Sequence, residues 1–298
     1  MTKVLRVSAV DRGFAGRQVL KDVSFDVTAG RMTGFVGANG AGKTTTMRII
    51  LGVLAPDSGE VTWDGRPLTR ADRQAFGYMP EERGLYPKMS VREQVVYLGR
   101  LHGLTAAEAT RGADDLLARV GLTDRAEDKL ETLSLGNQQR AQVAAALVHD
   151  PEVLVLDEPF SGLDPMAIDT VVSVLRERAR AGASVLFSSH QLDVVERLCD
   201  DVVIIADGVI RAAGEREALR RQYARREFEL MVDSDLGWLR DRPETRLTDL
   251  DGRRAIVELE PGADDQELLR DALARGPVRT FRPVVPTLAE IFREVTTR

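Results

Sequence analysis

Short apolar runs separated by glycines and polar turns recur in the first third of the chain and again from residue 150 to 206. The runs at 153–156 and 202–205 are unbroken, which is typical of strands buried on both faces of a sheet. We predict strands at 4–7, 23–27, 32–36, 153–157, 184–188 and 202–206. Because helical segments separate the later strands, the pattern predicts an α/β domain with a mostly parallel sheet.

The segment from about 88 to 150 has a different pattern. Its apolar residues recur at helical spacing, first Val91, Val95, Leu98 and Leu101, then Leu116, Leu117 and Val120. This spacing predicts a mostly helical insertion. Another helix is predicted from Lys43 to about Leu51, where Gly52 and Pro56 end it.

A charged run at 216–227 suggests a domain boundary near 218–226, and we expect domains at 1–220 and 221–298. The second domain has predicted strands at 228–232, 255–259 and 278–283 and helices at 264–275 and 287–297, a small α+β fold. Leu288, Ile291, Phe292 and Val295 form an apolar stripe on the last helix. The stripe either packs against the domain's own sheet or serves dimerisation or regulation.

Composition limits the class of protein. The 298 residues are 43% hydrophobic and 30% charged, as in a globular protein, and the net charge of −6 argues against a nucleic-acid partner. We expect no signal peptide and no membrane span, since no stretch approaches the roughly 18 consecutive apolar residues that a span needs. Cys199 is the single cysteine, which excludes an internal disulfide.

The first motif with chemical meaning is a P-loop. The segment 37–44 has the pattern GxxxxGK[ST] between a predicted strand and a predicted helix. Loop amides and the helix N-terminus favour phosphate, Lys43 would reach the β and γ phosphates, and the Thr44 hydroxyl would bind Mg²⁺. The residues expected to contact the nucleotide here are Gly37, Ala38, Asn39, Gly40, Ala41, Gly42, Lys43, Thr44 and Thr45.

The second motif is a pair of acids that follows the strand at 153–156. Asp157 and Glu158 would lie at the carboxyl end of that strand, where open α/β sheets place their ligands. Asp157 suits the surroundings of Mg²⁺. Glu158 suits the general base that activates the attacking water.

Five further segments, in matching order, resemble the ABC ATPase family over residues 1–215. They are a signature-like Leu133–Arg140, a D-loop-like Ser161–Asp164, a switch-like His190, an aromatic Phe14 ahead of the P-loop, and a Q-loop-like Gly77–Leu85. The resemblance implies an ABC ATPase fold, a mixed sheet with a β-subdomain and a helical subdomain at about 88–150. It also implies ATP and Mg²⁺ as the ligands.

The same resemblance implies a role for each matching residue. Ser134, Gly136 and Asn137 would bind the ATP of the opposite subunit, and Asp164 would lie at the dimer interface. His190 would contact the γ-phosphate and act with Glu158 and Lys43 in catalysis, and Phe14 would stack on adenine. Glu81 stands where the family has a metal-contacting glutamine and would keep the metal contact together with Thr44 and Asp157.

The sequence departs from the family pattern at three positions. Glu81 replaces the Q-loop glutamine, Leu135 stands where the signature has glycine, and Asn137 replaces its final glutamine. We expect Glu81 to keep the coupling role. We expect phosphate binding to survive at the signature, because Ser134 and the backbone provide it.

With one P-loop and one signature per chain, the resemblance implies hydrolysis between two ATPase subunits, identical or different, that dock on separate membrane-spanning permease subunits. The protein would lie at the cytoplasmic face of the membrane, and the extension ending in 286–292 resembles that of sodium- and drug-export ATPases. The alternatives are an ABC ATPase that acts on the ribosome or DNA and a nucleotide sensor without turnover. The presence of Glu158 and His190 disfavours the sensor.

Overall fold

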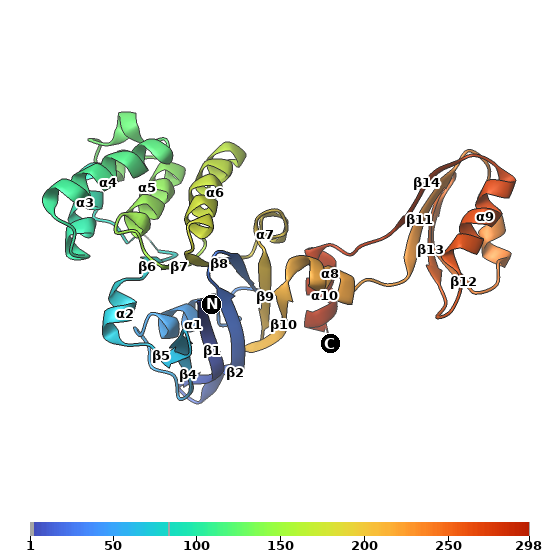
Figure 1. Cartoon of the computed structure of the whole chain (residues 1–298), viewed down its shortest axis with the longest axis horizontal. Coiled ribbons are helices and arrows are strands. Elements are labelled where there is room, and N and C mark those ends of the chain that lie inside the picture. Colours follow the sequence, from blue (N-terminus) through green and yellow to red (C-terminus); the bar gives the residue numbers. More distant parts are fainter. Residues whose placement is uncertain (1–2, 83, 298) are drawn as a thin grey trace. The chain divides into compact units, whose positions relative to one another are not determined.

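The computed structural model describes residues 3–82 and 84–297 and contains two compact units, residues 1–216 and 217–297. Figure 1 shows the course of the chain through both. The first unit contains every residue proposed above for nucleotide chemistry. Each unit is described separately below.

The centre of the first unit is a six-stranded sheet in the order β10-β9-β3-β8-β7-β6. The strands are β3 (Met32–Val36), β6 (Gly77–Met79), β7 (Val153–Leu156), β8 (Ser184–Ser189), β9 (Asp201–Ala206) and β10 (Val209–Glu215). All pairings are parallel except that of β10 with β9. This confirms the predicted mostly parallel sheet. Every residue of β3, β7 and β8 is buried, as expected for strands covered on both faces.

A second, antiparallel sheet packs against the first in the order β2-β1-β4-β5. Its strands are β1 (Val4–Phe14), β2 (Arg17–Thr28), β4 (Ser58–Trp63) and β5 (Arg66–Pro67). One apolar core joins the two sheets; among its members are Leu5, Leu20, Phe35, Ile50 and Ile205. This core fixes β2 beside the loop that follows β3.

Seven helices of the first unit are α1 (Lys43–Ile50), α2 (Arg70–Gln74), α3 (Val91–Leu101), α4 (Ala106–Arg119), α5 (Leu135–Leu147), α6 (Pro165–Arg180) and α7 (Leu192–Leu198). Short 3-10 turns occur at η1 (Thr123–Arg125) and η2 (Leu130–Thr132). Capping boxes start α3 at Ser90 with Glu93 and α4 at Thr105 with Glu108. Helices α3, α4 and α5 pack on one another as a separate helical group (Figure 1), as the periodicity predicted. Among the described residues, no helix combines the length and apolarity that crossing a membrane requires.

The second unit contains a four-stranded antiparallel sheet in the order β12-β13-β11-β14. Its elements are α8 (Arg216–Gln222), β11 (Glu227–Val232), η3 (Gly237–Asp241), β12 (Thr245–Asp251), β13 (Arg254–Leu259), α9 (Asp265–Arg275), β14 (Val278–Pro283) and α10 (Leu288–Thr297). Leu268 and Ala272 of α9 pack into the core on one face of the sheet. The predicted small α+β fold is confirmed.

The last helix, α10, does not pack into this core. Leu288, Ile291 and Val295 are buried, yet none of them belongs to the cluster that α9 and the sheet form. Instead, Arg220 Nε of α8 donates a 2.9 Å hydrogen bond to Pro286 O just before α10. The expectation that the stripe packs against the small sheet is therefore wrong.

Candidate functional site

The loop between β3 and α1 has a backbone that only glycine permits at two positions. A Cβ on Gly37 would lie 2.5 Å from Ile205 O, and one on Gly42 would lie 2.5 Å from Leu20 Cδ2. Gly42 also has a φ of 112°, in the left-handed region. The glycine spacing recognised in the sequence thus corresponds to close approaches to β9 and β2.

Helix α1 begins at this loop without a side-chain cap. Its N-cap is Gly42, and the first turn contains no acidic residue. The first backbone amides of a helix lack intrahelical acceptors and carry the positive end of the helix dipole. The start of α1 can therefore accept an anion.

Lys43, the first residue of α1, is nearly buried under the loop. Its Nζ donates hydrogen bonds to Gly37 O at 2.6 Å and Ala38 O at 3.3 Å, and the residue is 7% exposed. The ammonium group is thus held among loop carbonyls and amides. A phosphate bound at the start of α1 would lie beside a fixed positive charge.

The two acidic residues after β7 are joined through a neighbouring strand. Asp157 accepts hydrogen bonds from Thr44 Oγ1 at 2.8 Å and from Ser188 Oγ at 2.5 Å. Ser188 Oγ in turn accepts from the backbone N–H of Glu158 at 2.8 Å. The hydroxyl of Ser188 on β8 therefore binds both the carboxylate of Asp157 and the backbone of Glu158. Sequence reasoning missed this residue, because only the β7–β8 register brings it to the site.

Glu158 has an unusual backbone conformation and a histidine partner. Its φ is 53°, a left-handed value that costs energy for a residue with a side chain. The peptide is held by the 2.8 Å bond from Gln139 Nε2 to Glu158 O, and Oε2 lies 3.0 Å from His190 Nδ1. The structure thus brings the predicted base and the predicted switch histidine into contact.

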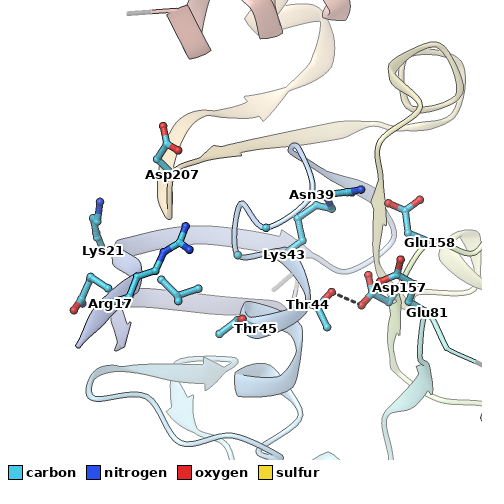
Figure 2. A pocket seen from close by; sticks show the side chains of 14 residues that line it. Arg17, Lys21, Asn39, Lys43, Thr44, Thr45, Glu81, Asp157, Glu158 and Asp207 are labelled. Carbon is cyan, nitrogen blue, oxygen red and sulfur yellow. Dashed lines mark hydrogen bonds between the residues drawn. The ribbon is translucent and has the colours of Figure 1, made fainter. Parts of the chain in front are cut away.

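A cavity of about 800 Å³ joins these groups, as Figure 2 shows. It is lined by Arg17, Gln18, Val19, Lys21, Asn39, Gly40, Gly42, Lys43, Thr44, Thr45, Glu81, Asp157, Glu158 and Asp207. The sequence analysis named the loop residues and the three acids Glu81, Asp157 and Glu158. It missed the β2 residues and Asp207, whose types carry no motif.

The remaining predicted residues lie outside this cavity. Ser134 caps α5 by accepting a hydrogen bond from the Asn137 amide at 3.3 Å, and Asp164 caps α6 by accepting one from Ala167 at 2.8 Å. Gly136 lies in the first turn of α5 next to Leu135, which is 61% exposed.

Phe14 at the end of β1 also lies outside the cavity, 44% exposed, with the Arg12 guanidinium 4.8 Å from its ring centroid. Within the Q-loop-like segment, Arg83 falls outside the described residues.

The oxygen ligands at this site suit Mg²⁺ bound together with phosphate. Thr44 Oγ1 and Asp157 Oδ2 lie 2.8 Å apart, and the described residues contain no group of three or more His, Cys, Asp or Glu that could hold a metal alone. Mg²⁺ is usually held by one or two protein oxygens, substrate phosphates and water. The residues present therefore fit such an ion.

Comparison with known families agrees with this geometry. The family model described as "ABC transporter" matches residues 20–161, and the model described as "ATP-binding protein DrrA1-3-like, C-terminal domain" matches residues 214–296. The first match contains the loop, Thr44, Asp157 and Glu158. The second contains the small sheet, α9 and most of α10.

Three similar proteins extend the comparison. The ABC transporter ATP-binding protein YhaQ of Bacillus subtilis is 38% identical over 98% of both chains. The Nod factor export ATP-binding protein I of Burkholderia lata is 39% identical over 70% of both. A solved structure titled as the ATP binding subunit of an ABC transporter has a TM-score of 0.68 and 35% identity, over 74% of this chain and 93% of its own.

Proposed function

Because the chain belongs to the ATP-binding proteins of ABC transporters, which hydrolyse ATP to power transport, we propose that it does so between two ATPase subunits that drive export through separate permeases. The observation that carries the proposal is the bond from Thr44 of the phosphate loop to Asp157. It would join the proposed phosphate site to the carboxylate proposed for Mg²⁺. The steps below assign the individual roles.

ATP binding is assigned to the loop and α1. The uncapped amides at the start of α1 would hold the β and γ phosphates, and Lys43 would exchange its bonds to Gly37 O and Ala38 O for phosphate oxygens. The cavity has room for a nucleotide at about 800 Å³. Phe14, with its ring 44% exposed, is available for the base.

Mg²⁺ is assigned to Thr44 and Asp157, with Glu81 at the edge of the same cavity. Three carboxylates, Glu81, Asp157 and Glu158, line a cavity that would receive a polyanion, so a divalent cation is needed to offset their repulsion. When bound, the ion neutralises charge on the phosphates. Asp157 is already fixed by Thr44 and Ser188 and needs no rearrangement to bind it.

Hydrolysis is assigned to Glu158 as the general base. The residue is 8% exposed and lines the cavity, and His190 Nδ1 lies 3.0 Å from its Oε2. A buried carboxylate with a positioned hydrogen-bond partner can accept a proton from water at the γ-phosphate. His190 would orient this carboxylate and contact the γ-phosphate.

The second ATPase subunit would contribute Ser134, Gly136, Asn137 and Asp164. In the single chain, Ser134 and Asp164 are N-caps that lie outside the cavity. Ser134 and Asp164 therefore lie at helix N-termini, which favour phosphate, and we propose that these ends face the ATP bound by the other subunit. The proposed dimer is arranged head to tail, so that each ATP lies between the loop of one subunit and Ser134 of the other.

The permease is assigned to a groove of about 390 Å³ on the first unit. Its lining includes Phe76, Pro80, Leu85 and Leu98. The lining also includes Val53, which is 73% exposed. Exposed apolar residues on the neighbouring segments include Tyr86 at 58%, Tyr97 at 41% and Leu101 at 64%. Such a concentration of exposed apolar residues is typical of a protein interface. A permease segment docked here would lie within a few residues of Glu81 and could transmit its state.

Export is proposed from the relatives and from the C-terminal unit. A similar protein is named for Nod factor export, and residues 214–296 match a DrrA1-3-like domain. The working location would then be the cytoplasmic face of a membrane. Nothing in the comparisons favours action on the ribosome or DNA.

Affinity purification of the tagged full chain from detergent-solubilised cells tests this proposal. We expect a membrane protein with several spans to co-purify in a fixed ratio and to stimulate ATP hydrolysis. Recovery with ribosomes or DNA instead of a membrane protein would contradict the transport role.

A further inference from the structure

We propose that Arg17 and Lys21 of β2 bind the α-phosphate of the nucleotide and thereby set its affinity, a role that rests on the proposed function. Neither residue belongs to a nucleotide-binding motif in the sequence. Both line the same cavity as Lys43, Thr44 and Asp157.

The strand β2 fixes where these two side chains point. Leu20 is fully buried in the core and Lys21 beside it is exposed, so the alternation of the strand turns the Lys21 side chain to the other face. Arg17 is paired directly with Phe14 across the β1–β2 hairpin. The two residues therefore flank the turn of this hairpin, with Arg17 lining one end of the cavity and Phe14 outside it.

The turn between β9 and β10 supports this end of the cavity. Lys21 N donates a 2.8 Å hydrogen bond to Gly208 O, and a Cβ on Gly208 would lie 2.1 Å from Val19 O. The turn and β2 are thus in close backbone contact, which holds Lys21 in place. The same turn contributes Asp207, whose carboxylate is paired with Arg211 at 4.0 Å and not with either cation of β2.

In the part of the chain that the structure describes, Arg17 and Lys21 have no polar side-chain partner. By contrast, Arg6, Arg12 and Arg31 of the same unit are all paired with aspartates. An unpaired arginine and lysine that line a polar cavity attract an anion.

The charges divide the cavity into two ends. Figure 2 shows Arg17 and Lys21 at one end, Lys43 in the middle, and Glu81, Asp157 and Glu158 at the other end. Lys43 and the start of α1 hold the β and γ phosphates, and the three acids lie where the γ-phosphate and Mg²⁺ would bind. The next anionic group along the nucleotide, toward the cationic end, is the α-phosphate.

The test is a binding titration of the purified full chain with MgATP and, separately, with ADP, for the wild type and the double variant Arg17→Gln/Lys21→Gln. ATP and ADP share the α-phosphate, so we expect both affinities to fall by about tenfold, which corresponds to about 1.4 kcal/mol. The charge-conserving variant Arg17→Lys/Lys21→Arg should bind both nucleotides as the wild type does.

A matched control is Arg70→Gln/Lys88→Gln, which removes the same charges at exposed positions outside the cavity. This control should bind both nucleotides as tightly as the wild type. Raising the salt concentration should reduce the difference in nucleotide affinity between the wild type and Arg17→Gln/Lys21→Gln, because salt screens exposed charges. If Arg17→Gln/Lys21→Gln bound both nucleotides as tightly as the wild type, or lost affinity for ATP alone, the inference would be overturned. The proposed function would still stand in that case, provided that the wild type binds MgATP. Failure of the wild type to bind MgATP would refute the proposed function itself.

Discussion

Nδ1 of His190, just after β8, lies 3.0 Å from Oε2 of Glu158, just after β7. The two residues come from neighbouring parallel strands, so the sheet itself brings the imidazole to the carboxylate. The contact holds the Glu158 side chain in one orientation within the cavity. A general base needs this kind of positioning, because the proton must move over hydrogen-bond distance.

Replacing the carboxylate tests its role directly. Glu158→Gln keeps the size of the side chain and its contact with His190 but cannot accept a proton from water. Turnover should fall by about 10²–10⁴-fold, the usual contribution of a general base. Steady-state ATP hydrolysis measures this loss, and equilibrium ATP binding should be retained. Wild-type turnover in Glu158→Gln would show that another group is the base.

The hydroxyl of Ser188 should matter more than its small size suggests. Ser188→Ala removes the donor to Asp157 and leaves the buried Glu158 N–H without its acceptor. Losing a buried partner costs about 1–3 kcal/mol, so we expect a lower unfolding free energy together with slower turnover.

The matched control for Ser188→Ala is Ser184→Ala on the same strand. The Ser184 hydroxyl is buried, and among the described residues it has no hydrogen-bond partner. Urea titrations and hydrolysis assays should therefore show little change for Ser184→Ala. Equal effects of the two substitutions would indicate that Ser188 acts only through packing.

Stability should depend on pH through a pair of stacked histidines. The rings of His102 and His149 have centroids 3.6 Å apart, and burial, together with the nearby His102, lowers the pKa of His149 to about 4. In the unfolded chain the pKa of His149 is near 6.5, so on acidification the unfolded state binds a proton before the folded state does. The free energy of unfolding therefore falls as the pH drops from about 6.5 toward 4.

Between pH 7 and 5 this effect should amount to about 1 kcal/mol, after allowance for the partial exposure of the ring. Urea titrations at the two pH values measure it, with His149→Phe as the variant that keeps an aromatic ring without a titrating group. The variant should lose less stability than the wild type over this range. The same loss in both proteins would assign the pH dependence to other groups.

The sequence was most informative where local pattern and structure coincide. The strands β3, β7 and β8 are buried throughout, so their unbroken apolar runs were recognisable. Strand β1 was predicted only at 4–7, although it extends to Phe14. The prediction stopped early because irregular pairing and a left-handed Ala9 interrupt the alternation of apolar and polar residues beyond Val7. The short α2 has no buried residue and therefore left no periodic signal.

The same distinction applies to the site. The loop at 37–44 and the acids Asp157 and Glu158 form contiguous motifs, so the sequence alone could single them out. Ser188, Arg17, Lys21 and Asp207 are brought in by strand register and by the approach of the β9–β10 turn to β2. One sequence contains no signal for such contacts, since their residue types are common at exposed turns and strand ends.

The central claim is that the loop at 37–42 and Lys43 bind the phosphates of MgATP. The most direct measurement is an equilibrium titration of the full chain with MgATP, for the wild type and for Lys43→Met. Saturable binding by the wild type and a loss of at least about tenfold in the variant are expected, since a charge-assisted hydrogen bond contributes about 1.5–3 kcal/mol. No binding by the wild type, or equal binding by a folded Lys43→Met protein, would contradict the account.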